Sequence, residues 1–460
     1  MTYAAIGSAD TVLREEDIRA ELYTALERIG HRRRVAVVPP DMSRFHSRAG
    51  RITELAWEYY RSELRSVLPA IGTHLPMTRE ELTHMFGSVP EGLFRVHDWQ
   101  RDLATLGRVP AEFIREVSEG RVDFSWPAQL NAGLLEENYD LILSVGQVVP
   151  HEVVGMANYN KNIFVGTGGE ESIHKSHYLG AVCGMERIMG RIDTPVRRVL
   201  NYASQHFAGD LPIVYVLTVV GRDEAGELVV RGLFIGDDED CFRHAAELSQ
   251  QVNVTVLPER VDTVVVYLDP REYKSTWIGN KAVYRSRMAI ADGGRLIVLA
   301  PGVHTFGENR EIDRMIRAHG YVGTDEVIRR VQAAETVPGA GAADAAGAGT
   351  ERRDNRQPPL GENLAAAAHL IHGSSEGRFS ITYCPGALSR EEIEGVNYHF
   401  EDLEKMSARY LPSDRRIGMH RTADGEPYYF ISNPGLGLWK AAEGPADTGT
   451  AAEGPARDRP

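Results

Sequence analysis

Short runs of apolar residues alternate with segments of helical periodicity along most of the chain. Residues 35–38 (VAVV) and 141–145 (LILSV) are almost entirely apolar, which is typical of parallel strands covered on both faces. Between such runs, apolar residues recur every three or four positions, as expected for helices with one buried face. The alternation predicts an α/β fold with mostly parallel sheets. The predicted helices cover residues 10–30, 51–66, 172–189, 239–251, 273–291 and 309–319, and further helices are predicted to begin near Thr78 and Ser389. The predicted strands cover residues 35–38, 67–71, 141–145, 163–166, 213–219, 228–233, 263–268 and 295–299, and ordered structure is expected to resume at residues 379–383.

The same pattern divides the chain into two α/β domains, residues 1–258 and residues 259–440. We expect a binding cleft between them, because open α/β sheets bind ligands beyond the carboxyl ends of their strands. Residues 333–362 are rich in Ala, Gly and Pro and are predicted to be a flexible insertion in the second domain. Residues 441–460 repeat a low-complexity motif and are predicted to be a disordered tail. An arrangement in which the final segment before this tail returns to the first domain stays open.

Composition and charge argue against several classes of function. The 460 residues carry a net charge of −14, which disfavours a nucleic-acid partner because binding a phosphate backbone requires grouped cations. The basic cluster at residues 31–34 directly precedes a strand and is interpreted as a solvated helix end. Apolar runs such as residues 213–220 are too short to cross a bilayer, so no membrane association is expected. Three scattered cysteines and the lack of a signal-peptide pattern predict a cytoplasmic protein.

Three predicted strands are each followed by residues suited to acid–base or ionic chemistry. Asp41 and Arg44 follow the first of them, His74 the second and His151 the third. The carboxyl ends of parallel strands share one edge of a sheet, where α/β proteins bind their ligands. A carboxylate, a guanidinium and two imidazoles at one edge therefore predict an active site there.

Lys161 and His177 come just beyond the third of these strands. An ammonium beside an apolar run is costly to bury unless something neutralises it, and such lysines often serve as covalent anchors. The predicted helix would place His177 on one face with His174. An ordinary loop lysine with two unrelated histidines remains an alternative. Another is a zinc-dependent hydrolase in which His174, His177 and the carboxylate of Glu170 or Glu171 hold the metal.

Jointly, these residues resemble the lactate racemase family, whose members use a nickel-pincer nucleotide. Asp41-Met42-Ser43-Arg44 resembles the family's Asp-x-Thr-Arg element, and Gly72-Thr73-His74 resembles the loop of its first catalytic histidine. Pro150-His151, then Lys161 and His177, resembles its arrangement of second catalytic histidine, cofactor-bearing lysine and nickel ligand. Residues 277–281 (WIGNK) resemble a Tyr-Gln-x-x-Lys element that faces the substrate.

The resemblance implies an isomerase, a racemase or epimerase that inverts C2 of a 2-hydroxyacid by proton-coupled hydride transfer. Its nickel-pincer nucleotide, a Ni(II) pyridinium-3,5-bisthiocarboxylate mononucleotide, would be attached covalently at Lys161. The imidazole of His177 would complete the nickel coordination, and a four-coordinate planar site suits Ni(II). His74 and His151 would be the two acid–bases, because inversion needs one on each side of the substrate. The resemblance implies cofactor contacts from Asp41, Ser43 and Arg44, and substrate contacts from Arg44, Trp277 and Lys281.

The chain departs from the family pattern beside the lysine and in the substrate element. Residues 158–160 are Asn-Tyr-Asn where the family has Gly-Gly-x, Trp277 replaces a Tyr and Ile278 replaces a Gln. These changes alter the pocket more than the chemistry, so a 2-hydroxyacid larger than lactate, such as an aldonate, is expected beside lactate itself. A homologue that binds the cofactor without turnover stays an alternative. Loading would require cofactor-synthesis proteins, and the sequence does not determine the oligomeric state.

Overall fold

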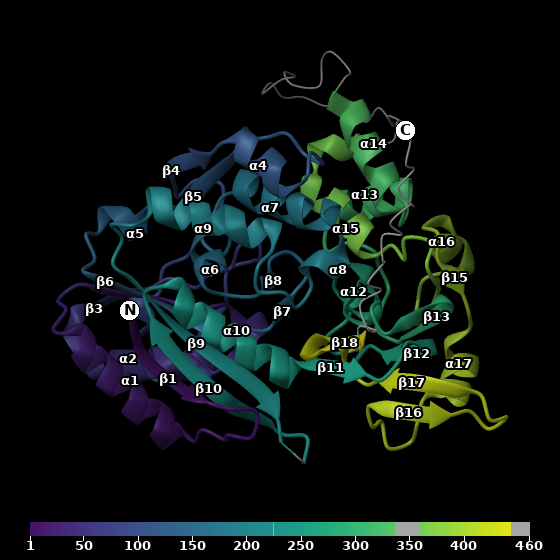
Figure 1. The fold of residues 1–460 in the computed structure, drawn as a ribbon, viewed down its shortest axis with the longest axis horizontal. Coiled ribbons are helices and arrows are strands. Elements are labelled where there is room, and N and C mark those ends of the chain that lie inside the picture. Colours follow the sequence, from purple (N-terminus) through teal and green to yellow (C-terminus); the bar gives the residue numbers. More distant parts are fainter. Residues whose placement is uncertain (224, 336–357, 443–460) are drawn as a thin grey trace, which may run out of the picture.

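The structure, a computed structural model, describes residues 1–223, 225–335 and 358–442. They form two six-stranded sheets side by side, with helices packed around and between them (Figure 1). The predicted α/β class with mostly parallel sheets is confirmed. None of the helices in these residues combines the length and the apolar character needed to cross a membrane.

The first sheet has the strand order β1-β10-β9-β6-β2-β3. Its strands are β1 (Thr2–Gly7), β2 (Val35–Val38), β3 (Leu64–Val67), β6 (Leu141–Gln147), β9 (Ile213–Arg222) and β10 (Leu228–Gly236). Strands β3, β2, β6 and β9 are parallel neighbours, whereas β10 and β1 extend the sheet antiparallel. Strands β9 and β10 follow one another in the chain and pair antiparallel.

Strand β2 is apolar throughout because both of its faces are covered. Its first and third residues point into the core shared with α1 (Glu15–Ile29) and α2 (Ala49–Tyr60). Its second and fourth residues join the core on the other face, which α10 (Glu239–Asn253) helps to cover. Successive side chains of a strand point to opposite faces, so a strand between two helical layers needs a continuous apolar run.

The boundary between α2 and β3 differs from the prediction. The helix predicted to residue 66 ends at Tyr60, because Arg61 adopts a left-handed φ of +50° and a short 3-10 turn follows. The strand predicted over residues 67–71 is wrong, since β3 ends at Val67. Beyond Val67 only isolated pairing with the end of β2 continues, in which Leu68 and Ala70 donate to the carbonyls of Val37 and Pro39 at 2.8 and 2.7 Å.

Residues 163–166 are not the strand that their apolar run predicted. Residues Asn160–Phe164 form the short helix α6, whose Lys161 carbonyl accepts hydrogen bonds from Val165 and Gly166 at 2.9 and 3.0 Å. Short apolar runs do not distinguish a strand from a buried helical turn, and here the tertiary contacts decide. The following helix was predicted to reach residue 189, but α7 (Glu170–Val182) stops before Gly184, whose φ of +89° breaks it.

The second sheet has the order β15-β14-β13-β12-β17-β16 and is antiparallel only between β16 and β17. Its strands are β12 (Val261–Tyr267), β13 (Ile290–Ala300), β14 (Ser380–Pro385), β15 (His399–Phe400), β16 (Gly418–Arg421) and β17 (Pro427–Ile431). The helix predicted over residues 273–291 is wrong. It is replaced by α11 (Thr276–Gly279) and α12 (Lys281–Ser286), because the chain enters β13 at Ile290.

Two predicted mobile segments fall mostly outside the described residues. Of the insertion at 333–362, residues 336–357 are not described, while its ends belong to α14 (Thr324–Glu335) and a 3-10 turn at Leu360–Glu362. Of the tail at 441–460, residues 443–460 are not described. Just before that tail, β18 (Leu438–Ala441) pairs with β11 (Val254–Leu257), which directly follows α10. The end of the described chain therefore returns to the junction between the sheets.

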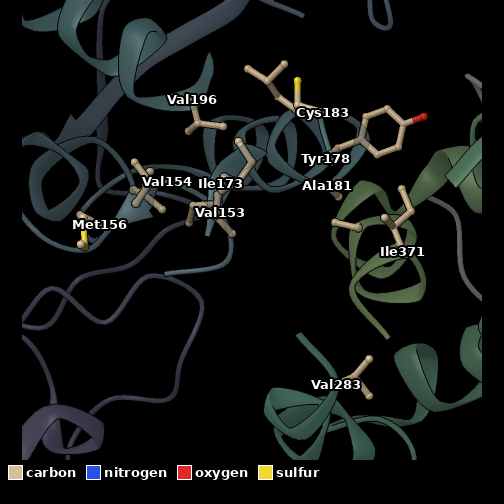
Figure 2. Close-up of a cluster of buried hydrophobic side chains, with 14 of the residues drawn as sticks. Val153, Val154, Met156, Ile173, Tyr178, Ala181, Cys183, Val196, Val283 and Ile371 are labelled. Atoms are coloured by element: carbon tan, nitrogen blue, oxygen red, sulfur yellow. The ribbon is translucent and has the colours of Figure 1, made fainter. Parts of the chain in front are cut away.

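A single apolar core joins helices that belong to the two sheets. Helix α15 (Leu364–His372) packs against α7, and both lie between the sheets with α12 (Figure 1). Figure 2 shows Ile173 and Ala181 of α7 in one cluster with Val283 of α12 and Ile371 of α15. This core holds α7 and α12 in place, and each carries predicted site residues.

Candidate active site

Asp41, His74 and His151 follow β2, β3 and β6, which are neighbours in the first sheet. Asp41 follows β2 and caps the 3-10 segment η1 (Met42–Ser47), accepting a hydrogen bond from the Ser43 backbone N–H at 3.1 Å. This turn carries Arg44 beyond the sheet edge. His151 ends β7 (Pro150–His151), a two-residue strand just after β6 that pairs with β8 (Gly155–Met156). The predicted convergence of strand ends therefore has a structural basis.

Asp41 and His74 form a hydrogen-bonded pair, with 2.6 Å between Asp41 Oδ2 and His74 Nδ1. The hydroxyl of Ser43 donates to the other carboxylate oxygen at 2.5 Å. Burial would raise the pKa of Asp41, but the hydrogen bond and charge of His74 outweigh it and lower that pKa below its ordinary value. The ionised carboxylate holds a proton on Nδ1, which leaves Nε2 of neutral His74 as a lone-pair acceptor.

The loop that carries His74 is docked against the end of α6. Gly72 has a φ of +56°, a left-handed conformation that suits glycine, and its N–H donates to the carbonyl of Gly166 at 2.8 Å. The side chain of His74 itself is 64% exposed. It therefore forms the outer edge of the site.

Lys161 is half-buried on α6, and its ammonium has no hydrogen-bond or ion-pair partner within the described parts of the chain. Burial is the main cause that lowers the pKa of Lys161 to about 8, and the charge of Arg44 lowers it further. Glu152 and Asp41 oppose this shift. The amine can thus lose its proton close to neutral pH, as a covalent anchor requires.

Asparagines on either side of Lys161 fix its position. Arg197 donates a hydrogen bond to the side-chain oxygen of Asn160, whose amide group donates to Asn201 at 2.7 Å. Asn162 donates to the carbonyl of Val38 at 2.9 Å. The backbone of α6 is therefore tied both to the carboxyl end of β2 and to α9 (Pro195–Phe207).

His177 on α7 is oriented for coordination through Nε2. Its Nδ1 donates to the carbonyl of Ile173 at 2.6 Å, which leaves Nε2 with its lone pair. Burial lowers the pKa of His177 to about 4, and the charge of Lys161 contributes. Lys161 and His177 thus lie close enough to interact, and the imidazole is neutral, as a metal ligand must be.

His174 has a different environment. Burial lowers its pKa, and the charges that act on it come from Glu170 and Glu311. Within the described residues no three His, Cys, Asp or Glu side chains cluster as a metal site. The zinc alternative therefore lacks the three protein ligands that such sites usually have.

His151 is 5% exposed, and its Nδ1 accepts a hydrogen bond from the backbone N–H of Val153 at 3.1 Å. Burial lowers the pKa of His151 well below its ordinary value, the charges of Lys161 and Arg44 lower it further, and Glu152 opposes them. The second predicted acid–base histidine is therefore deep in the site, unlike His74.

Positive charge is in excess around these histidines. Arg44 and Lys281 are half-buried, and neither has a hydrogen-bond or ion-pair partner in the part of the chain that the structure describes. Burial lowers the pKa of Lys281 to about 8, and burial together with Arg285 lowers that of Arg44. Arg285, one turn after Lys281 on α12, donates to the carbonyls of Pro150 and Gly437 at 3.1 and 3.0 Å. Helix α12 is thereby tied to the strand of His151.

Trp277 lies on α11, and its indole packs against the imidazole of His369 with 4.3 Å between ring centroids and a tilt of 31° between the rings. Its backbone N–H donates to the carbonyl of Phe306 at 2.9 Å. These contacts place Trp277 against α15, and its contact with substrate stays a prediction.

Several residues around the site were not predicted. Glu152 alters the pKa values of Arg44, His151, Lys161, His177 and Lys281, so its carboxylate lies at the centre of the site. The position of Glu152 directly after His151 in the sequence could have indicated that it belongs to the site. His46 is a second such residue, because burial and the charges of Arg44 and Lys281 lower its pKa to about 4. No sequence signal pointed to His372, a long way beyond the insertion, whose buried Nε2 has no hydrogen-bond partner among the described residues.

The chain is similar to proteins of known family and known structure. Residues 23–188 match the family model described as the lactate racemase N-terminal domain. A crystal structure of a protein from Thermotoga maritima aligns with a TM-score of 0.75 and 23% identity, covering 95% of this chain and 100% of that one. The lactate racemase apoprotein from Thermoanaerobacterium thermosaccharolyticum aligns with a TM-score of 0.62 and 15% identity, covering 95% of this chain and 90% of that one. No curated protein sequence matches the chain.

The two structural alignments establish a shared fold across nearly the whole chain. The family match covers the segment that carries Asp41, His74, His151, Lys161 and His177. Through residues 23–188, the chain is similar to the N-terminal domain of the lactate racemase family.

Proposed function

We propose that the protein is an isomerase that inverts C2 of a 2-hydroxyacid with a nickel-pincer nucleotide bound to Lys161. The observation that carries the proposal is the pairing of Lys161 and His177. The amine is half-buried and unpartnered among the described residues, and the neighbouring imidazole keeps Nε2 free by donating Nδ1–H to Ile173. An ordinary loop lysine would be solvated or ion-paired instead.

The chain's own residues fit this cofactor. Lys161 would hold it covalently, which would remove the charge of the buried ammonium, and Nε2 of His177 would complete a planar nickel site. Arg44 suits a phosphate or carboxylate group, and its lack of a partner among the described residues leaves its guanidinium available. We assign cofactor contacts to Asp41 and Ser43 from the family pattern. In the structure, Asp41 accepts hydrogen bonds from His74 and from the hydroxyl of Ser43. When bound, the cofactor supplies a hydride acceptor for the C2 hydrogen.

The imidazoles of His74 and His151 accept and return the proton of the substrate hydroxyl group. Nε2 of His74, with Nδ1–H held by Asp41, is set to remove it from one stereoisomer. His151 serves the opposite stereoisomer from the inner side of the site. Burial favours the neutral form of His151, so a proton that it takes up is readily returned.

We propose a substrate larger than lactate, such as an aldonate. Lys281 and Arg44 would bind its carboxylate, since neither has a hydrogen-bond or ion-pair partner within the described residues. The ammonium of Lys281 lies over the ring of Tyr273, 5.9 Å from its centroid. The buried, unpaired Nε2 of His372 could receive a further hydroxyl group. Lactate's methyl group would leave such a group unsatisfied, which costs about 1–3 kcal/mol.

Cofactor-synthesis proteins would be needed for loading. The three cysteines, Cys183, Cys241 and Cys384, are free and buried. Free cysteines fit a reducing compartment, so we propose the cytoplasm.

The test combines mass spectrometry with chiral analysis. Protein loaded with the nickel-pincer nucleotide is digested, and the peptide containing Lys161 should carry the cofactor mass, whereas a Lys161→Ala variant should lose it. The loaded protein is then incubated with lactate, malate, 2-hydroxyglutarate and gluconate, and inversion at C2 is measured. Replacing His74 with Ala should reduce inversion by about 100-fold or more.

The matched control is His304→Ala, since His304 is an exposed histidine whose Nδ1 bonds only its own loop at Gly302. This variant should invert the substrate at the wild-type rate. Cofactor mass on Lys161 without inversion of any 2-hydroxyacid would favour a homologue that only binds the cofactor. An unmodified Lys161 in protein that inverts a substrate would overturn the proposed attachment.

A further inference from the structure

The two acid–base histidines differ in what their Nδ1 atoms bond. Nδ1 of His74 faces the carboxylate of Asp41, an acceptor, so it carries a proton. Nδ1 of His151 faces the backbone N–H of Val153, a donor, so it carries none. Neutral His74 therefore has its lone pair on Nε2, whereas neutral His151 has its proton there.

The state of His151 in the structure cannot complete a proton transfer at Nε2. A neutral imidazole with Nε2 already protonated cannot accept a proton there, and donating that proton would produce an unstable imidazolate. Acid–base work at Nε2 requires a cycle between the imidazolium and the neutral form protonated on Nδ1. Both of these forms have an Nδ1–H group. This group would face the N–H of Val153, and two donors cannot form a hydrogen bond with each other.

The Nδ1–H of a working His151 therefore needs an acceptor other than Val153. The carboxylate of Glu152 lies nearest, with 3.7 Å between its Oε2 and Nδ1. The side chain of Glu152 is 23% exposed, and the one hydrogen bond to its carboxylate from the described residues comes from its own backbone N–H. A small rotation of either side chain would bring Oε2 within hydrogen-bond distance of Nδ1.

We infer that Glu152 is the positioning residue of His151 and plays the part that Asp41 plays for His74. In the resting state His151 bonds Val153. When Nδ1 becomes protonated, the imidazole exchanges the Val153 N–H for the Glu152 carboxylate, and the Nε2 atom becomes competent to accept or donate the hydroxyl proton. The inference deepens the proposed function and rests on His151 acting as an acid–base.

Charge supports Glu152 over other acceptors. Its carboxylate stabilises the charged form of His151, whereas Lys161 and Arg44 oppose that form. Arg285 and His151 keep Glu152 itself ionised despite its burial, which lowers its pKa below the ordinary value. An anion is therefore available at the point where a transient imidazolium would form.

The first experiment tests the hydrogen bond without the reaction. Cofactor-free protein labelled with 15N-histidine is examined by NMR, in which the two ring nitrogens report which of them carries a proton, and His151 is assigned with a His151→Gln variant. Wild-type His151 should exchange between the Nε2–H form and an Nδ1–H form. In Glu152→Gln the Nδ1–H form should decline, while His74 keeps its proton on Nδ1.

The second experiment measures inversion by cofactor-loaded protein on whichever 2-hydroxyacid the wild type inverts. Glu152→Gln should lower kcat by about 10- to 100-fold, the usual effect of losing a hydrogen-bonding partner that orients a functional histidine. KM should change less than threefold, and the cofactor mass on Lys161 should be unchanged. Glu112→Gln, which alters an exposed glutamate on α4 (Ala111–Val117), serves as the control and should behave as wild type.

A kcat of Glu152→Gln within twofold of wild type would sink the inference, as would a His151 spectrum that the substitution leaves unchanged. Loss of cofactor mass in Glu152→Gln would instead make Glu152 a structural residue. If the loaded wild type inverts nothing, the proposed function fails, and the NMR result still decides whether Glu152 bonds His151.

Discussion

Lys161 shows how a single side chain is prepared for chemistry by its surroundings. Burial of its ammonium and the charge of Arg44 lower the pKa of the amine to about 8. Asp41 and Glu152 limit the shift. The sequence predicted a lysine in a costly position, but the size of this effect depends on side chains that are brought together only by folding.

Competitive labelling measures this effect. Trace acetic anhydride reacts only with neutral amines, so cofactor-free protein is labelled between pH 6 and pH 11 and the peptides are quantified by mass spectrometry. Labelling of Lys161 should reach half of its maximum near pH 8, whereas exposed lysines ordinarily titrate near 10.4. The Arg44→Gln variant should move the Lys161 midpoint to higher pH, since it removes a repelling charge. A Lys161 midpoint at the ordinary value would contradict the described environment.

The turn before α6 is the element that sets the direction of Lys161. Asn158 and Tyr159 have φ values of +64° and +59°, in the left-handed region that favours glycine. The resemblance described from the sequence puts glycines at positions 158 and 159, where this chain has Asn and Tyr. Tyr159 compensates for the backbone strain by stacking on Phe242 with 5.1 Å between ring centroids and by lying 4.3 Å from the ring of Tyr215.

The Tyr159→Gly variant separates these two contributions. Glycine would relieve about 1–2 kcal/mol of backbone strain, but removing a buried aromatic ring costs about 3–5 kcal/mol. The variant should therefore be less stable by about 2–3 kcal/mol in urea unfolding. Tyr159→Phe keeps the ring and should change stability by less than about 1 kcal/mol. A more stable glycine variant would mean that the backbone strain dominates.

The stability of the whole molecule depends on neutral histidines that are buried at the junction between the sheets. His369 on α15 is 5% exposed, shares a hydrogen bond of 3.1 Å with the Tyr321 hydroxyl and packs against the tilted ring of Trp277. Burial lowers the pKa of His369 to about 3 and that of His372 to about 4. Helices α7 and α14, which contact α15, therefore pack against a helix whose two histidines must stay neutral.

Acidification should destabilise the protein through these residues. Near pH 5 His369 is neutral when folded but protonated when unfolded, so the unfolded state binds more protons and stability falls as pH drops below about 6.5. The contribution of His369 between pH 7 and pH 5 is about 2 kcal/mol. Urea unfolding at both pH values should show a smaller loss in His369→Gln than in wild type. His244→Gln, an exposed-site control, should leave the loss unchanged.

The sequence by itself determined the class of the fold and the residues at the strand ends. Runs such as residues 35–38 specify buried strands because both faces must be apolar, and the spacing of His151, Lys161 and His177 is a property of the chain alone. Element boundaries were less certain, because a short apolar run such as residues 163–166 satisfies a strand or a helical turn equally well.

Only the tertiary structure decided which groups act on one another. Glu152, His46, Arg285 and His372 come from four separate elements, and their roles arise from burial and from charges brought close by packing. The Asp41–His74 hydrogen bond and the Val153–His151 hydrogen bond likewise depend on side-chain directions. Electrostatic interactions depend on distance and on exclusion of water, and neither is encoded in the order of residues until the two sheets and their shared core are assembled.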